Sequence, residues 1–190
     1  AWSLGAIPRA KTASVADVAV GESIVFAGVG RGAEALRAAR AGAQVTGVDV
    51  AAPMLARLAR EAEKQGVEVR CCEASVFEFA PTDPFDRVVA NFVLNVFAGN
   101  GLGHAIDAMT SWVAPGGEVT VADFAPITGS AARRMLAHAH YWPVALAARA
   151  LGLCRLHAPH DYRPMFEVRG FALVSSRDIG LYRVEHFERR

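Results

Sequence analysis

The chain has 190 residues, of which 53% are hydrophobic and 21% charged, so it fits one globular domain and is not a disordered protein. Its 20 Lys and Arg balance 19 Asp and Glu to a formal net charge of +1, without the basic excess of most nucleic-acid-binding domains. We find no signal peptide, and the most apolar stretch, residues 144–154, is shorter than the roughly 20 residues of a membrane span. We therefore expect a cytoplasmic protein without stable membrane insertion.

The first half of the chain alternates short β-branched runs with longer alanine-rich, amphipathic runs, which is typical of an α/β sheet. Gly42 follows the first amphipathic run and Pro53 opens the second, as expected for a helix end and for a first helical turn. The predicted elements of this half are strands at 23–28, 44–49, 67–72 and 85–93, with helices at 31–41 and 53–65.

The second half is less regular, and residues 124–165 are the expected lid or substrate cover. Pro143 should break a long helix, and Gly180 should turn the last two strands into an antiparallel pair. The predicted elements are a loop containing Gly99, Gly101 and Gly103, a helix at about 104–113, a turn at 115–117, a strand at 118–123, a helical stretch at 129–152, a short helix at 164–169, and strands at 171–178 and 182–187. Together they predict a single domain over residues 1–190, an α/β, Rossmann-like doubly wound sheet that is mostly parallel with an antiparallel C-terminal strand.

A glycine-rich sequence, VFAGVGRGAEAL, joins the first strand to the first helix. Gly28, Gly30 and Gly32 lie where missing side chains let backbone approach a ligand, beside the unpaired N–H groups of a helix N-terminus. Asp49 lies 21 residues after Gly28, at the end of the second strand, where a carboxylate can accept both hydroxyls of a ribose. The order of strand, glycines, helix, strand and acid favours a nucleoside ligand over plain tight-turn glycines with a capping aspartate.

The same glycines also satisfy the G-x-G-x-x-[GA] pattern of NAD-binding proteins. Three features disfavour NAD: there is no room for a separate substrate domain, the third strand ends in a further acidic candidate, and the chain closes with an antiparallel strand pair. An NAD(P)-linked oxidoreductase therefore stays an alternative of lower rank.

The series VFAGVGRGAEAL, VTGVDVAAPML, CEAS, FDRVVANFVLN and VAPGGEVTVADF resembles the motifs of class I S-adenosylmethionine-dependent methyltransferases. It is most similar to their small-molecule branch, which includes the ubiquinone and menaquinone C-methyltransferases, over about residues 17–123. The resemblance implies S-adenosylmethionine as cofactor and methyl transfer to a small-molecule acceptor such as a quinone or phenol, with no nucleic-acid partner. A protein of the same fold that binds the cofactor without transferring methyl groups is the alternative from another class.

The resemblance also implies a role for each residue that matches a family motif. Glu73 stands where the family usually has Asp and Cys72 where it has Gly, so the adenine end departs from the family pattern. The implied cofactor contacts are Gly28, Gly30 and Gly32 along the methionine part and adenosine, Asp49 on the ribose, Val50 and Ala51 beside the adenine, Glu73 on the adenine amino group, the Ala74 amide on a ring nitrogen, and Asn91 at the methionine end.

Candidates for taking a proton from a hydroxyl or carbon acceptor lie in the sequence LHAPHDY, which contains His157, His160 and Tyr162. The alternative is that His160 and Asp161 cap the next helix while Tyr162 packs. His138, His140, Tyr141 and Trp142 could cover a planar acceptor from the lid, and Asp123 points into the same crevice. We expect no metal site, because no third ligand accompanies the two histidines, and the three cysteines form no disulfide framework.

Overall fold

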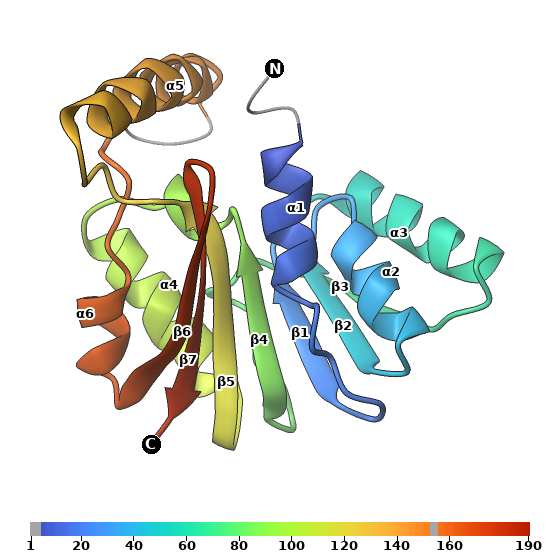
Figure 1. Cartoon of the computed structure of the whole chain (residues 1–190). Coiled ribbons are helices and arrows are strands. Elements are labelled where there is room, and N and C mark those ends of the chain that lie inside the picture. Colours follow the sequence, from blue (N-terminus) through green and yellow to red (C-terminus); the bar gives the residue numbers. More distant parts are fainter. Residues whose placement is uncertain (1–4, 153–155) are drawn as a thin grey trace.

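The computed structural model describes residues 5–152 and 156–190, so Cys154 lies outside the described part. Seven strands form one sheet in the order β3-β2-β1-β4-β5-β7-β6 (Figure 1). The first five are parallel and β7 pairs antiparallel with both β5 and β6, which confirms the predicted sheet. The strands are β1 Ser23–Ala27, β2 Gln44–Asp49, β3 Val69–Glu73, β4 Phe85–Asn91, β5 Val113–Phe124, β6 Phe171–Ile179 and β7 Tyr182–Arg189.

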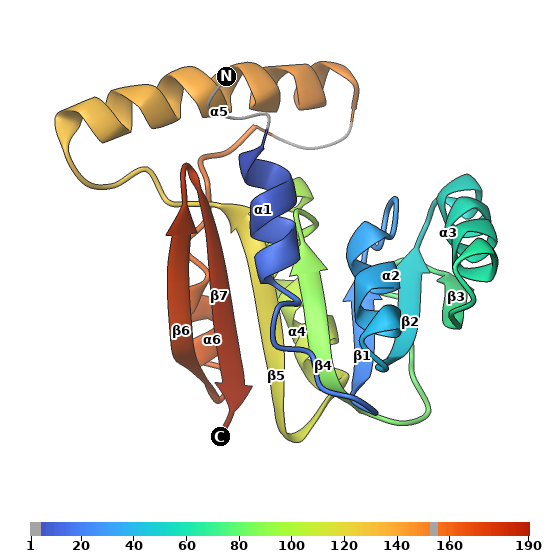
Figure 2. The same cartoon turned by 45° about the vertical axis from the view of Figure 1, so that its right-hand side comes forward.

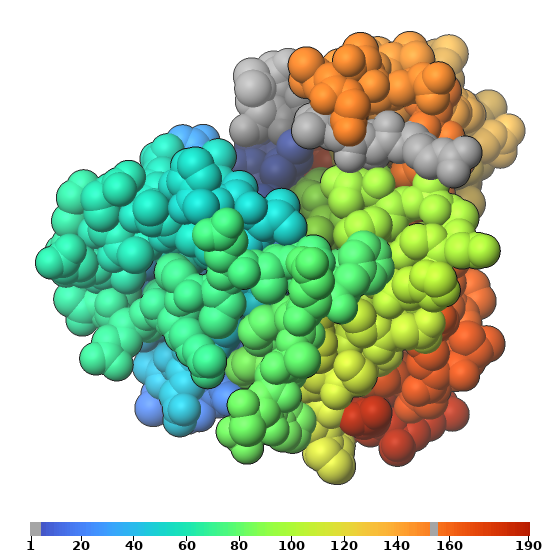
Figure 3. Space-filling model, turned by 180° about the vertical axis from the view of Figure 1, so that it is seen from behind, coloured from blue at the N-terminus to red at the C-terminus, as the bar shows by residue number. Residues whose placement is uncertain are grey.

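Helices cover both faces of the sheet, and one long helix lies across its carboxyl edge. They are α1 Ala6–Ala13, α2 Ala33–Arg40, α3 Ala52–Lys64, the 3-10 helix η1 Leu94–Val96, α4 Asn100–Ser111, α5 Ala131–Ala150 and α6 Arg163–Glu167. α1 and α2 lie in front of the sheet and α4 behind it, whereas α5 lies above the strand ends (Figure 2). Seen from behind, α5 forms the upper rim of the molecule (Figure 3).

The core follows from the alternation of side chains along buried parallel strands. In β1, Ile24 and Phe26 pack with α2 and α3, whereas Val25 and Ala27 pack on the opposite face with α4. A third cluster joins α1 to β5, β6 and β7 around Tyr182. The sheet is therefore buried on both faces through its centre.

Three predicted boundaries were wrong. α4 begins at Asn100, so Gly101 and Gly103 are helical, because the helix buries an apolar face that includes Leu102 and Ile106 and this outweighs glycine propensity. α5 continues through Pro143, whose exposed position leaves the missing hydrogen bond on the solvent side. The predicted turn at 115–117 lies within the irregular start of β5. Helix α1 was not predicted.

Candidate cofactor and acceptor site

The parallel pairing brings the predicted cofactor residues to one edge of the sheet. β1, β2, β3 and β4 are consecutive neighbours, so their carboxyl ends lie together. Asp49 and Glu73 are direct register partners at the ends of β2 and β3, while Asn91 ends β4 on the other side of β1. The glycine-rich turn follows β1, between these two groups. This is the crevice at which open α/β sheets bind ligands.

The Asp49 carboxylate is held in place by backbone amides. Its Oδ2 accepts a hydrogen bond from the Gly30 N–H at 2.7 Å and its Oδ1 accepts one from the Ala51 N–H at 2.9 Å. Each carboxylate oxygen has a second lone pair, so both can still accept a ligand hydroxyl. The carboxylate is therefore oriented before any ligand arrives, as a ribose-binding acid should be.

The three glycines of the turn differ in how much space surrounds the position of a side chain. A Cβ on Gly28 would lie 2.7 Å from Val93 Cγ2, and one on Gly32 would lie 2.5 Å from Leu58 Cδ1. A Cβ on Gly30 would meet nothing closer than the Gly28 carbonyl oxygen at 4.0 Å. Gly28 and Gly32 are thus required by packing, while Gly30 faces open space beside Asp49.

This difference predicts different outcomes for two alanine substitutions. Gly32→Ala should destabilise the fold by about 2 kcal/mol, because the new Cβ overlaps Leu58 at a backbone φ of +71°. Gly30→Ala should cost about 1 kcal/mol, from its φ of +54° alone, yet weaken nucleoside binding. Urea unfolding of both variants measures their stabilities, and titration of Gly30→Ala with the nucleoside measures its binding. Equal stability of the two variants would contradict the prediction.

The adenine end differs in one respect from the prediction. The Ala74 N–H donates to the Asp49 backbone carbonyl at 3.1 Å as part of the continuing β2–β3 pairing, so it is not free to bind an adenine nitrogen. Glu73 is exposed, and no hydrogen bond or ion pair joins its carboxylate to the other described residues. Val50 and Phe77 are both more than half exposed at this end, and Phe77 is an apolar wall that the sequence reasoning missed.

Asn91 presents a buried acceptor that the protein itself does not use. Its Nδ2 donates to the Ser14 hydroxyl at 2.9 Å, and Ser14 is fully buried. Its Oδ1 is buried and, within residues 5–152 and 156–190, has no hydrogen-bond partner. Because such an orphan acceptor is costly, it marks a place for a donor from a ligand.

A second polar cluster centres on Asp123, at the end of β5. Asp123 is only 2% exposed and accepts hydrogen bonds from Tyr162 Oη (2.8 Å), Asn95 Nδ2 (2.8 Å) and the Phe124 N–H (2.7 Å). Burial raises the pKa of Asp123 to about 6, although the hydrogen bonds act in the opposite direction. The pKa of Tyr162 is raised well above its usual value, first by burial and then by the nearby Asp123 carboxylate. Tyr162 is therefore a fixed donor, which argues against its predicted role as a base and for the packing alternative.

The two histidines of the same segment stack with ring centroids 4.2 Å apart and hold it against the residues after β4. His157 has Nε2 2.9 Å from the Asn95 carbonyl and Nδ1 2.7 Å from the Ala158 carbonyl, so both ring nitrogens lie against backbone carbonyls. His160 Nε2 lies 3.2 Å from the Phe97 carbonyl. Burial, followed by the charge of His157, lowers the pKa of His160. A neutral His160 that donates from Nε2 keeps the Nδ1 lone pair, so it alone of the three predicted candidates suits proton acceptance.

Other parts of the predicted lid divide into inward and outward residues. Tyr141 is buried and donates to the His157 carbonyl at 2.8 Å, and His140 Nε2 lies 2.8 Å from Tyr182 Oη. Trp142 instead donates to the exposed His138 at 2.9 Å. Asp161 Oδ1 accepts from the Arg163 N–H at 3.3 Å, but the N-cap residue of α6 is Tyr162 and no side chain caps it, so the predicted capping by His160 and Asp161 was wrong.

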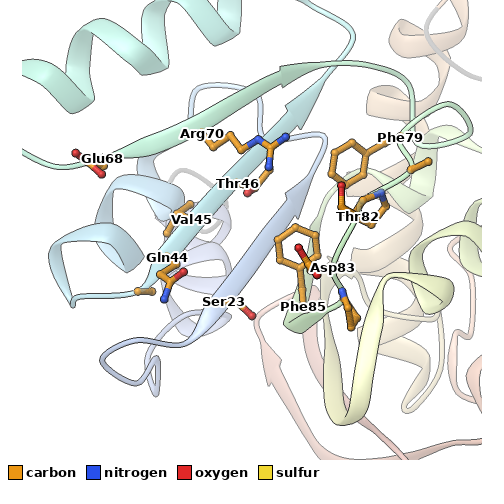
Figure 4. Close-up of a pocket in the computed structure, with 14 residues that line it drawn as sticks. Ser23, Gln44, Val45, Thr46, Glu68, Arg70, Phe79, Thr82, Asp83 and Phe85 are labelled. Carbon is orange, nitrogen blue, oxygen red and sulfur yellow. The ribbon is translucent and has the colours of Figure 1, made fainter.

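A groove of about 510 Å³ lies at the opposite edge of the sheet (Figure 4). It is lined by the beginnings of β1, β2 and β3 and by residues 79–85, including Thr46, Arg70 and Phe79. Residues 74–84 contain no helix to cover this face of the sheet. The groove is remote from Asp49 and Asn91. We assign the cofactor crevice to the carboxyl edge of the sheet instead, because the polar groups and the strand topology both point to that edge.

The comparison with protein families agrees with this geometry. A family described as "Methyltransferase domain" matches residues 24–117, the segment that carries the glycine turn, Asp49 and Asn91. The similarity to this methyltransferase domain extends over 94 of the 190 residues, just under half of the chain. The predicted resemblance to class I methyltransferases is thereby confirmed. Among the described residues, no helix is long and apolar enough to cross a bilayer.

A curated relative, the demethylmenaquinone methyltransferase of Thermus thermophilus, is 40% identical over 86 residues, covering 45% of this chain and 38% of the relative. The match thus spans well under two thirds of the relative's length. The Burkholderia thailandensis 1,6-didemethyltoxoflavin-N1-methyltransferase, solved with its acceptor and S-adenosylhomocysteine, has a TM-score of 0.73 at 21% identity, covering 98% of this chain and 79% of its own. The Synechocystis magnesium protoporphyrin IX methyltransferase, solved with S-adenosylmethionine, has a TM-score of 0.69 at 16% identity, covering 98% and 79%. Both share the fold.

Proposed function

We propose that this protein binds S-adenosylmethionine at the carboxyl edge of β1–β4 and transfers its methyl group to a small-molecule acceptor. The observation that carries the proposal is the Asp49 carboxylate, fixed 2.7 Å from the Gly30 amide beside the open space in front of Gly30. The bound cofactor would supply a methyl group on a sulfonium: the acceptor's nucleophilic atom would bond to the methyl carbon in line as the methyl C–S bond breaks and S-adenosylhomocysteine leaves.

The protein's own residues bind and orient the cofactor. Asp49 accepts the ribose hydroxyls, and the buried Asn91 Oδ1 accepts from the ammonium of the methionine part. Val50 and Phe77 flank the adenine, with the exposed Glu73 near its amino group. Gly28, Gly30 and Gly32 shape the turn that lets the backbone approach. The Ala74 amide takes no part in adenine binding, because it donates to the Asp49 backbone carbonyl.

The acceptor is proposed to be a planar small molecule of the quinone or phenol type. Three of the similar proteins are named for small-molecule acceptors, which are demethylmenaquinone, 1,6-didemethyltoxoflavin and magnesium protoporphyrin IX. A formal net charge of +1 does not favour nucleic acid as the acceptor. We place the reaction in the cytoplasm. The alternatives are cofactor binding without turnover and, of lower rank, an NAD(P)-linked oxidoreductase.

Calorimetric titration with S-adenosylmethionine, S-adenosylhomocysteine and NAD tests the cofactor part. We expect the two sulfur nucleosides to bind and NAD not to bind. Binding of NAD alone would overturn the proposal in favour of an oxidoreductase. Binding of the sulfur nucleosides without methyl transfer to any demethylated quinol or phenol would favour the cofactor-binding alternative.

His160→Gln should lower the rate of methyl transfer to a hydroxylated or carbon acceptor by about a hundredfold, because it removes the Nδ1 lone pair but keeps a polar side chain at the Phe97 carbonyl. Single-turnover transfer from radiolabelled S-adenosylmethionine to a demethylmenaquinol measures this. Cofactor affinity should not change. His138→Gln, on the outward side of α5, is the matched control, and an equal loss in both variants would remove the base role.

A further inference from the structure

Ser14 carries a fully buried hydroxyl that helix α1 does not need for its own end. The residue is the C-cap of α1, and its backbone N–H already donates to the Ala10 and Lys11 carbonyls at 3.1 and 3.2 Å. The hydroxyl donates to the Lys11 carbonyl a second time, at 2.7 Å. A serine that bonds back to the preceding turn adds little to a helix, and a buried hydroxyl is costly unless it is used. This hydroxyl therefore indicates a partner outside α1.

That partner is the side chain of Asn91. Because the hydroxyl proton of Ser14 is committed to the Lys11 carbonyl, the oxygen can only accept a hydrogen bond from Asn91. It accepts one from Asn91 Nδ2 at 2.9 Å, which leaves Oδ1 as the unpaired end of the amide. This Oδ1 is the buried acceptor without a hydrogen-bond partner in the described part of the chain. Ser14 thus decides which end of the amide is left for a ligand.

The backbone of Asn91 is fixed, whereas its amide group can turn. Asn91 is the register partner of Ala122 in β5, and the N–H of the next residue, Phe92, donates to the Ala122 carbonyl at 2.8 Å. The last torsion of an asparagine side chain is broad and roughly two-fold, so the two orientations of the amide differ little in torsional energy. The hydrogen bond from Nδ2 to Ser14 therefore selects between them.

Ser14 is in turn held in place by the segment that follows it. The chain from α1 to β1 runs along the face of β4 on which α1 lies (Figure 2). Further along this segment, Asp17 and Glu22 pair with Arg87 Nη1 and Nε, both at 2.7 Å. Arg87 and Asn91 are four residues apart on β4, so their side chains emerge on the same face. The segment is therefore tied to β4 at two points, and the Ser14 hydroxyl is in position before a ligand arrives.

We propose that Ser14 is a positioning residue of the cofactor site, which orients the Asn91 amide so that Oδ1 accepts from the ammonium of the methionine part. The inference rests on the proposed function, because it assigns a further residue to the same site. Without the Ser14 hydroxyl the amide can turn, and its NH₂ group would then meet the ammonium, where two donors form no hydrogen bond. Ser14 therefore sets the preference of the site for ligands that carry an amino group.

Two nucleosides that differ at the methionine end test the proposal. S-adenosylhomocysteine carries the ammonium, whereas 5′-methylthioadenosine has the adenosine and the sulfur but no amino acid part. By calorimetry, we expect Ser14→Ala to bind S-adenosylhomocysteine about tenfold more weakly than the wild type and to bind 5′-methylthioadenosine equally well. A merely structural role of Ser14 would weaken the binding of both nucleosides alike.

The matched control is Thr110→Val. It also removes a buried hydroxyl that donates to a helix carbonyl, that of Ile106 in α4 at 2.8 Å. Both nucleoside affinities should stay at the wild-type value in this variant. Urea unfolding shows that each variant is folded.

A second comparison shows whether Ser14 acts through Asn91. Asn91→Asp replaces the amide by a carboxylate, which presents an acceptor oxygen in either orientation. In the Asn91→Asp background, Ser14→Ala should therefore leave the ratio of the two nucleoside affinities unchanged. If Asn91→Asp does not fold, the contrast between Ser14→Ala and Thr110→Val decides by itself.

The proposal is overturned if Ser14→Ala weakens both nucleosides equally or weakens neither. It is also overturned if Ser14→Ala lowers the affinity ratio as much in the Asn91→Asp background as in the wild type. A wild type that binds S-adenosylhomocysteine but shows no effect of Ser14→Ala would refute this inference alone. A wild type that does not bind S-adenosylhomocysteine would refute the proposed function, and the role of Ser14 with it.

Discussion

Asp49→Ala is expected to weaken S-adenosylmethionine binding by about a thousandfold while the protein stays folded. The Asp49 carboxylate would make two charged hydrogen bonds to the ribose, each contributing roughly 1.5–3 kcal/mol. It is also oriented by Gly30 and Ala51, so binding needs little reorganisation. Calorimetry with S-adenosylhomocysteine gives the affinity, and urea unfolding shows whether the fold is retained.

A matched control for this variant lies at the other edge of the sheet. Asp86 also uses its carboxylate to accept a backbone N–H and a hydroxyl, both from Ser23 at 2.8 Å. Asp86→Ala should therefore cost comparable stability but leave cofactor affinity unchanged. If Asp49→Ala binds as tightly as Asp86→Ala, the ribose assignment fails, although the methyltransferase fold would stand.

The cofactor edge could be predicted from the sequence because its signals are local. The glycine turn and Asp49 each sit at the end of a strand whose buried residues are contiguous, and parallel pairing then brings the strand ends together without further information. Predicting that Gly30 and Asp49 lie close together therefore required only the correct assignment of the strands. The hydrogen-bond partner of the Ala74 amide could not be predicted in this way. It depends on how far the β2–β3 pairing continues, and no residue type specifies that length.

The Asp123 cluster could not be predicted, since its members are far apart in the sequence. Asn95, Asp123 and Tyr162 come from η1, the end of β5 and the segment before α6, and Asn95 carries no motif of its own. Similarly, Pro143 signals a helix break, and only the exposed position of the residue shows why α5 tolerates it. Long-range contacts and solvent exposure, rather than local propensity, decided these points.

Asp123 should make the stability of the protein fall between about pH 4 and pH 6. Its pKa in the folded protein is about 6, above the value of 3.8 expected for a free side chain, so the fold favours the protonated acid. The stability that this preference contributes is present in full below the unfolded pKa and is lost as pH rises through about 6. From the size of the shift, the loss is about 3 kcal/mol between pH 4 and pH 7.

Asp123→Asn removes this titration while keeping an oxygen that can accept from Tyr162. Urea unfolding of wild type and variant at pH 4, 5, 6 and 7 should therefore show the variant gaining on the wild type as pH rises, by about 3 kcal/mol across the series. Tyr162, which donates to Asp123, and His160, whose ring lies next to Tyr162, are common to both proteins, so their own titrations contribute little to the difference between wild type and variant. The exposed Asp83→Asn serves as control and should track the wild type. A constant difference between wild type and Asp123→Asn would mean that the carboxylate is already ionised at pH 4, held so by its three hydrogen bonds against the effect of burial.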